Sequence, residues 1–372
     1  MPEQEDLQHL TYQASGVNYN ILDKLKRLAA QAAAPTMESL RRTPFSEVLG
    51  TRGESGNIIE HPLFYLVSTT EGLGTKNLIA DEMHRLTGES YYEAIAQDTI
   101  ATIVNDVVAV GATPVTIEAF WAGGSKWFED SKDPEALAVG WGKVCEQIGL
   151  AWIGGETQVL NDMVRDDTVI LGGTVNGIVE PKERLVTGER LQAGDAILLV
   201  ESNGIHTNGL TLARELAKHL PQGYLTKISE DGPTYGESLL QPSRIYAPLI
   251  RALLNAEIDL HYVAHITGHG FRKLMRANQE LTYVIDHLPP VSSLFTFIQQ
   301  HTQATNEEMY GTFNMGAGYA IFVPQDEVEK IIAVGQEQGL HIHRAGRVEK
   351  GPKQVIIEEK GIIFPEESLA IR

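Results

Sequence analysis

The clearest hydrophobic pattern of the chain lies between Asp98 and Pro114. Apolar residues recur there at the i, i+3, i+4, i+7 spacing of an amphipathic helix: Ile100, Ile103, Val104 and Val107. At 100° per residue, the opposite face is polar and carries Asp98, Thr102, Asn105 and Asp106. Gly111 is expected to end the helix, and the apolar run 115–121 predicts the strand that follows.

The remaining first half alternates between helical and extended patterns. Residues 1–60 are polar and irregular, with a helix over 20–34 and a flexible loop at 51–57. The other predicted elements are strands over 63–70, 151–157 and 169–179, and helices over 77–86 and 133–148. A glycine loop, Glu71 to Lys76, follows the strand at 63–70.

The second half repeats this alternation. Strands are predicted over 196–200, 260–266, 282–286, 319–323, 341–348 and 354–358, and helices from 210 to 219 and over 271–277, 291–300 and 326–337. Residues 309–318 are predicted to form a polar glycine loop. The pattern predicts an α/β (α+β) chain of two domains, which 372 residues allow. Pro181 marks the boundary, giving an N-terminal segment 1–60 and domains 61–179 and 180–372.

Composition and charge narrow the function. The net charge of −19 repels nucleic acid backbones and argues against a nucleic-acid-binding protein. No apolar run is long enough for a membrane span, and the acidic start lacks the features of a signal peptide. Cys145 is the only cysteine and sits among apolar helix positions, so a buried thiol is expected and an internal disulfide is excluded. These features favour a cytoplasmic protein.

Oxygen ligands next to glycines or on the polar helix face suggest a Mg²⁺-nucleotide site. They are Glu71, Asp98, Asn105, Asp106 and Glu156, with Lys76 as a cation for phosphate. The simpler interpretation of each residue is a solvated side chain, and of the loop 71–76 an ordinary turn. The chain has no Walker A motif, no G-x-G-x-x-G, no H-E-x-x-H and no G-x-S-x-G, so classical nucleotide loops, zinc and serine hydrolase chemistry are disfavoured.

Several ordered motifs resemble the phosphoribosylformylglycinamidine cyclo-ligase (aminoimidazole ribonucleotide synthetase) family. Asp106 to Pro114 has its D-x4-G-A-x-P form, and Thr70 to Lys76 resembles T-D-G-V-G-T-K. Further matches are Thr11 to Val17 (Y-x-x-A/S-G-V), Val104 to Val108 (V-N-D-L-V), Gly154 to Thr157 (G-G-E-T), His206 to Gly209 (H-S-N-G), Ala264 to Phe271 (A-H-L-T-G-G-G-F) and Glu308 to Gly316 (E-M-Y-R-T-F-N-x-G). The resemblance covers nearly the whole chain.

This resemblance implies a homodimer whose N-terminal domains complete a β-barrel, with ATP and Mg²⁺ between each N-terminal domain and a second α/β domain. It implies ATP-dependent closure of formylglycinamidine ribonucleotide to aminoimidazole ribonucleotide through an iminophosphate, in purine biosynthesis. The implied metal ligands are Asp98, Asn105, Asp106 and Glu156. The implied nucleotide-binding residues are Glu71, Gly72, Gly74, Thr75, Lys76, Asp98, Asn105, Asp106 and Gly111. Lys76, Asp106, His206 and Asn208 would be catalytic, and Lys26 would close over ATP.

The chain departs from the family pattern at several positions. Glu71 replaces the loop aspartate, Val159 a second carboxylate and His269 the middle glycine of T-G-G-G, and Leu274-Met-Arg-Ala277 stands where N-I-P-R is usual. The alternatives are therefore a divergent relative that uses ATP on another small substrate and a non-catalytic nucleotide-binding dimer. Selenophosphate synthesis is disfavoured because an N-terminal cysteine is absent, and thiamine phosphate phosphorylation because the cyclo-ligase motifs fit better.

Overall fold

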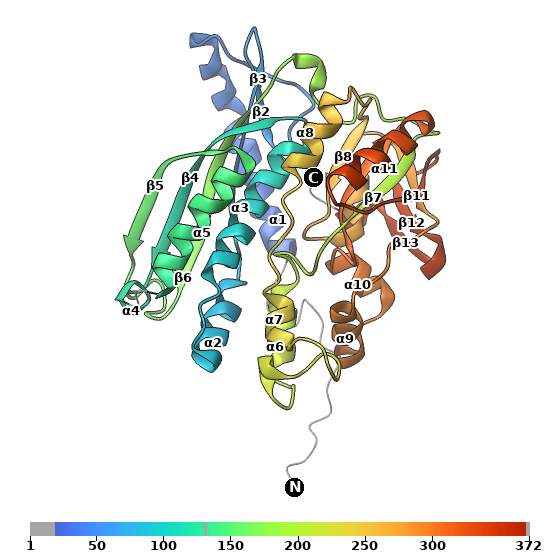
Figure 1. Cartoon of the computed structure of the whole chain (residues 1–372). Helices are drawn as coiled ribbons and strands as arrows, with labels where there is room; N and C mark the ends of the chain where they lie inside the picture. The colour runs from blue at the N-terminus through green and yellow to red at the C-terminus, as the bar shows by residue number, and fades with distance from the viewer. Residues whose placement is uncertain (1–18, 130–131, 370–372) are drawn as a thin grey trace.

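A computed structural model describes residues 19–129 and 132–369 of the chain. The strands form two separate sheets, one from residues 46–179 and one from residues 196–365 (Figure 1). The motif at 11–17 lies outside the described residues. No described helix is both long enough and apolar enough to cross a bilayer.

The first sheet has six strands in the order β1-β2-β3-β6-β4-β5. Their bounds are β1 Ser46–Glu47, β2 Asn57–Glu60, β3 Tyr65–Gly72, β4 Thr113–Gly123, β5 Ala151–Val159 and β6 Val169–Val179. All neighbours pair antiparallel except β4 and β5, which pair parallel. Strands β3 to β6 confirm the pattern-based prediction. The two-residue β1 and the short β2 lie in the segment predicted to be irregular.

One face of this sheet is covered by helices. They are α2 Asn77–Thr87, α3 Tyr92–Ala109 and α5 Lys132–Ile148, preceded by α1 Tyr19–Ala33 and the short α4 Ser125–Glu129. Helix α3 packs against β3, β4, β6 and α5 on one side and against β8 and α8 of the second domain on the other (Figure 1). The polar face predicted for this helix is therefore not a solvated surface. Asp98 and Asn105 on that face are buried.

The second sheet has seven strands in the order β13-β12-β9-β11-β7-β10-β8. They are β7 Ala196–Glu201, β8 Tyr262–His265, β9 Leu281–Ile285, β10 Ala317–Val323, β11 Ile342–Lys350, β12 Gln354–Ile357 and β13 Ile362–Pro365. β7, β8, β9 and β10 are buried along nearly their whole length. That burial explains why they read as continuous apolar runs and were predictable. The short β13 was not predicted.

The helices of the second half are α6 Leu210–Ala217, α7 Tyr235–Leu239, α8 Ala247–Asn255, α9 Ser293–Thr302, α10 Asn306–Thr312 and α11 Val328–Glu337. Residues 271–277, predicted as helix, form a 3₁₀ helix over Gly270–Met275. The prediction of a loop over 309–318 is wrong at its start, because α10 extends to Thr312. A capping box, in which Thr305 and Glu308 bond each other's backbone N–H, begins this helix.

Candidate active site

A cleft of about 540 Å³ lies between the two domains, where segments distant in sequence meet. From the first domain come residues 69–75 at the end of β3, the loop 54–57 and Asp106 of α3. From the second come residues 207–211 before and within α6, and residues 267–276 after β8. The hydroxyl oxygens of Thr102 on α3 and Thr207 lie 3.0 Å apart and join the two walls.

The acidic part of the cleft contains Glu71 and Asp106. The Asp106 carboxylate is 2.7 Å from Nδ1 of His265, a buried residue of β8, so the second domain fixes its position. Burial within the cleft, with the nearby charge of Asp106, raises the pKa of Glu71 to about 7. Gly74 has φ +81°, a backbone conformation that glycine adopts without strain, and it places its loop beside these carboxylates.

Another part of the cleft lining is basic. It is lined by Lys26 of α1, His269, Lys273 and Arg276. Burial lowers the pKa of Lys273 to about 8, with Arg276 adding to the effect. Burial also lowers the pKa of His269 to about 4, with Lys273 adding, so the imidazole is neutral near pH 7. His269 has φ +73°, a strained conformation for a residue with a Cβ.

Lys76 does not line this cleft, which disagrees with the phosphate-binding role predicted for it. Its side chain is fully buried and donates to Oδ1 of Asp98 at 2.7 Å and to the carbonyl of Gln241 at 2.8 Å. The same Asp98 oxygen accepts from the backbone N–H and the hydroxyl of Ser243, at 2.8 and 2.5 Å. Lys76 and Asp98 thus join the first domain to the segment 241–243 of the second.

Asn105 also lies at the junction between the domains and away from the cleft. Its amide donates to the carbonyl of Arg244 at 2.9 Å and accepts from the N–H of Tyr246 at 2.9 Å. His206, predicted to face the ligand, is buried behind the cleft with Nε2 3.1 Å from Oδ1 of Asn203. Burial holds the pKa of His206 well below its usual value. Asn208, two residues on, does line the cleft.

Glu156 and Gly111 do not line the cleft. Glu156 lies on β5, in a hollow of the first sheet that is also lined by Glu71 and Gly72. Gly111 ends α3 with φ +82°, and a Cβ at that position would lie 2.2 Å from the carbonyl oxygen of Arg184. Gly111 therefore allows close packing of the chain. Of the predicted nucleotide residues, Glu71, Gly72, Gly74, Thr75 and Asp106 line the cleft.

The donors in the cleft fit a Mg²⁺ ion that is also bound by phosphate. Within the described residues no group of three or more His, Cys, Asp or Glu side chains is placed to hold a metal. Mg²⁺ is commonly held by one or two carboxylates together with phosphate oxygens and water, so Glu71 and Asp106 suffice as the protein ligands. Asp98 and Asn105, predicted as further ligands, bond to the segment 241–246 and do not line the cleft, whereas Glu156 lines a second hollow together with Glu71.

Sequence reasoning named Lys26 but missed Lys273 and Arg276 in the basic part of the cleft. Lys273 and Arg276 follow the predicted glycine segment 267–270, but single basic residues near a helix are ordinary surface features in a sequence. The contact between His265 and Asp106 could likewise not be predicted from the sequence. The available signal was the departure from the family pattern after Phe271, where a basic residue occurs in place of N-I-P-R.

Comparison with known proteins identifies the two halves. Residues 57–179 match the family described as AIR synthase related protein, N-terminal domain, and residues 192–359 match its C-terminal domain. Among curated relatives, a protein of Methanocaldococcus jannaschii named phosphoribosylformylglycinamidine cyclo-ligase is 33% identical over 341 residues, covering 91% of this chain and 92% of that one. A Pyrococcus horikoshii protein of the same name is 34% identical over 355 residues, covering 95% and 99%.

Solved structures share the fold at lower identity. The hydrogenase maturation protein HypE in complex with ATP has a TM-score of 0.59 at 18% identity, over 80% of this chain and 84% of that one. AaThiL, complexed with AMPPCP and TMP, has a TM-score of 0.56 at 17% identity, over 84% and 89%. T. maritima PurL complexed with FGAR has a TM-score of 0.59 at 15% identity, over 90% of this chain and 50% of that one. With both family domains in order and about a third of its residues shared with cyclo-ligases along nearly its whole length, the chain belongs to the AIR synthase related family.

Proposed function

We propose that this protein is a phosphoribosylformylglycinamidine cyclo-ligase, which uses ATP to close formylglycinamidine ribonucleotide into aminoimidazole ribonucleotide in purine biosynthesis. The main support is the convergence of motifs in one cleft. The segments that resemble T-D-G-V-G-T-K, V-N-D, H-S-N-G and T-G-G-G are far apart in the chain, yet each contributes residues to the same 540 Å³ cavity. The relatives at 33–34% identity carry this activity in their names.

In this proposal the reaction transfers the γ-phosphoryl group of ATP to the formyl oxygen. The neighbouring amine then attacks the formyl carbon, and phosphate leaves as the imidazole ring closes, with ADP as the other product. Ring closure is intramolecular, so the protein contributes mainly positioning and charge stabilisation. Glu71 and Asp106 would hold Mg²⁺, which neutralises phosphate charge, while Asn208 and the hydroxyls of Thr75 and Thr207 offer hydrogen bonds to ligand.

The basic part of the cleft supports a phosphorylated second substrate. Lys273 and Arg276 line the same cavity as the 71–75 loop, so the cavity offers cations for a phosphate other than those bound to Mg²⁺. The strained backbone at His269 marks this basic part of the cleft as a functional region, because such a conformation persists only where the surroundings enforce it. We place the ribonucleotide on this side and ATP on the side of Glu71.

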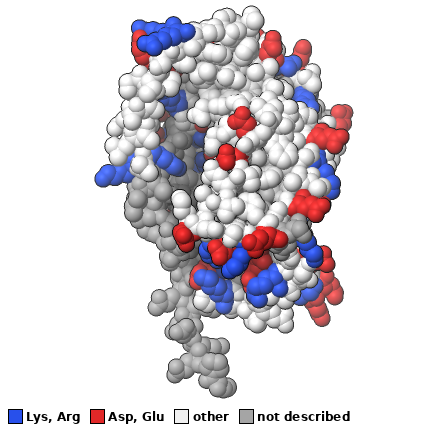
Figure 2. Space-filling view, turned by 90° about the vertical axis from the view of Figure 1, so that its left-hand side faces the viewer, with Lys and Arg blue, Asp and Glu red and all other residues white. Residues whose placement is uncertain are grey.

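We also propose that the protein is a homodimer formed through the uncovered face of the first sheet. Exposed apolar side chains spread over this face and its edge strand: Val115, Phe120, Trp152, Ile153, Val159 and Ile170. Figure 2 looks at this side and shows a broad surface with few charged residues. Strand β5 pairs only with β4, which leaves one edge open. Phe120→Arg should convert a dimer to a monomer in light scattering; a wild-type monomer would contradict this assembly.

The test of the function is phosphate release from Mg-ATP with and without formylglycinamidine ribonucleotide, together with detection of the aminoimidazole product. Phosphate release that requires the ribonucleotide and yields product supports the proposal. ATP binding without turnover of this substrate would refute it and favour a relative that acts on another small molecule or binds nucleotide without catalysis. A cytoplasmic location, which the composition favours, belongs to the same proposal.

A further inference from the structure

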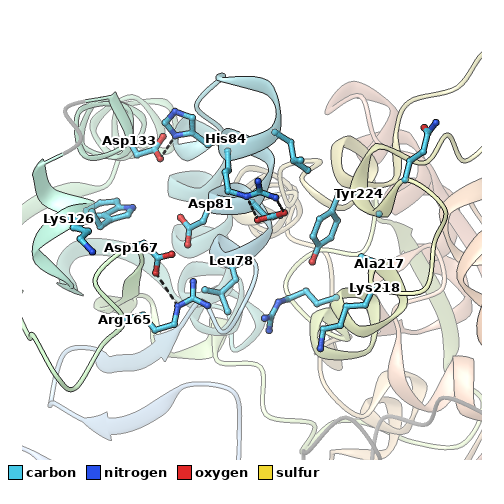
Figure 3. A pocket seen from close by; sticks show the side chains of 17 residues that line it. Leu78, Asp81, His84, Lys126, Asp133, Arg165, Asp167, Ala217, Lys218 and Tyr224 are labelled. Carbon is cyan, nitrogen blue, oxygen red and sulfur yellow. Dashed lines mark hydrogen bonds and ion pairs between the residues drawn. The ribbon is translucent and has the colours of Figure 1, made fainter.

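A second cavity, of about 660 Å³, lies between the same two domains and shares no lining residue with the cleft (Figure 3). One wall comes from α2, α4 and the segment 165–167 of the first domain. The other comes from α6 and the residues that follow it, including Lys218 and Tyr224 (Figure 3). The groove and the cleft lie close together, because Leu78 of α2 and Arg214 of α6 line the groove while Thr75 and Thr211, three positions earlier, line the cleft. The proposed reaction does not use it.

Five cationic and four acidic side chains line the groove. Four of the cations have carboxylate partners: Arg85 pairs with Glu82, Lys126 with Asp166, Arg165 with Asp167 and Lys218 with Glu215. These four cationic side chains are exposed, so their ion pairs are weak and can open toward a bound anion.

Arg214 is the exception on the α6 wall. In the described part of the chain it forms no ion pair, and its polar neighbour is the hydroxyl of Tyr224. It is half-buried, and it faces the groove. A guanidinium in this setting is suited to a phosphate or carboxylate, because it stays charged and offers several donors in one plane.

Asp133 provides a complementary feature on the opposite wall. Its side chain is 7% exposed, and one carboxylate oxygen lies 2.6 Å from Nδ1 of His84. The other oxygen, Oδ1, is buried and has no hydrogen-bond partner among the described residues. A buried carboxylate oxygen without a donor is unfavourable, so a ligand that donates a hydrogen bond there gains affinity. Figure 3 shows Asp133 and Tyr224 on opposite sides of the groove.

We infer that this groove is a second ligand site, which binds a small phosphorylated sugar or a similar phosphate monoester. The phosphate would contact Arg214, and hydroxyl groups at the other end of the ligand would donate to Oδ1 of Asp133. The cavity volume lies within the usual range for such ligands. Because Arg214 has no carboxylate partner among the described residues, a doubly charged phosphate fits better there than an amine.

Fluorine NMR of protein labelled with 5-fluorotryptophan tests this inference. The chain has four tryptophans, and Trp127 lines the groove whereas none lines the cleft. The other three, Trp121, Trp141 and Trp152, form a cluster with ring centres 5.6 to 6.1 Å apart. Trp127→Phe assigns the reporter resonance. We expect ribose 5-phosphate to shift the Trp127 resonance saturably and to leave the cluster unchanged.

Arg214→Gln should weaken this binding about tenfold or more, which corresponds to the loss of one charge-assisted contact. Lys143→Gln, a change to an exposed lysine outside the groove, is the matched control and should bind as wild type. No shift up to about 10 mM ligand, equal affinity in Arg214→Gln, or a response to spermidine alone would overturn the inference. Because Trp127 does not line the cleft and the experiment measures binding, these results do not depend on turnover.

Discussion

The buried ion pair between Lys76 and Asp98 gives the sharpest prediction of this structure. The sequence analysis predicted that Lys76 binds a phosphate. In the structure the side chains of Lys76 and Asp98 are both fully buried at the domain junction. Burial lowers the pKa of Lys76 and raises that of Asp98, so each charge depends on the other. Removing the cation leaves a buried carboxylate whose remaining donors are the N–H and hydroxyl of Ser243.

Lys76→Met should therefore destabilise the protein by about 3–5 kcal/mol, the range for breaking one side of a buried pair. That is a large fraction of the stability of a typical domain. Adding Asp98→Asn removes the uncompensated charge and keeps an acceptor for Ser243. The double variant should therefore recover about 2 kcal/mol or more relative to Lys76→Met, which makes the pair strongly coupled in a double-mutant cycle.

The assay is urea unfolding followed by tryptophan fluorescence, with Mg-ADP binding measured on each folded variant. Lys143→Met is the matched control, because the Lys143–Glu93 pair has a similar distance of 2.8 Å but both side chains are more than half exposed. It should cost less than about 1 kcal/mol. If Lys76→Met cost no more than this control and instead abolished nucleotide binding, the junction role would be refuted and the phosphate role restored.

Three further predictions concern single side chains. Asp106→Ala should abolish Mg-dependent ATP turnover while far-UV circular dichroism stays unchanged, because Asp106 faces the cleft; full activity would exclude it as a ligand. Glu71→Gln should raise the melting temperature relative to wild type at pH 8 but not at pH 4. The folded state holds the Glu71 proton up to about pH 7, so wild-type stability falls as pH rises from about 4.5 to 7. Cys145 should react with a disulfide reagent at pH 8 at least about a hundredfold more slowly when native than when unfolded, because burial raises its pKa to about 11; rapid labelling would contradict its burial.

Much of the fold could be predicted because buried strands and amphipathic helices leave strong patterns. The strand predicted over 169–179 matches β6 exactly, and the long helix at 98–110 corresponds to α3. Shorter elements escaped because their local signals are weak or mixed. Helix α10 contains Gly311 and polar residues, so its composition resembles a loop, although the Thr305 to Glu308 capping box was present in the sequence. The short helix α7 was also not predicted, although it begins with a capping box at Thr234.

The site was predictable only in part, for a physical reason that α3 illustrates. Hydrophobic periodicity identified which polar residues share a face, but it does not show what lies opposite that face. Carboxylate and amide oxygens on a helix can bind a metal or accept hydrogen bonds from a second domain. Both roles need oxygen atoms at the same spacing along the helix. In the structure the face divides: Asp98 and Asn105 bond to the segment 241–246, whereas Thr102 and Asp106 line the cleft.

A lysine of the same chain distinguishes a carboxylate that joins two domains from one that can bind a metal. Where a buried carboxylate has a lysine of its own chain within hydrogen-bond distance, as Asp98 has Lys76, its charge is already compensated and a metal would gain little there. Where the partner is a histidine on the far side and the carboxylate remains open to a cavity, as for Asp106, room for a metal remains. Glu71 forms no ion pair with the described residues, and its pKa is raised first by desolvation in the cleft and second by the charge of Asp106. Two carboxylates that share a cavity favour a proton until a cation replaces it.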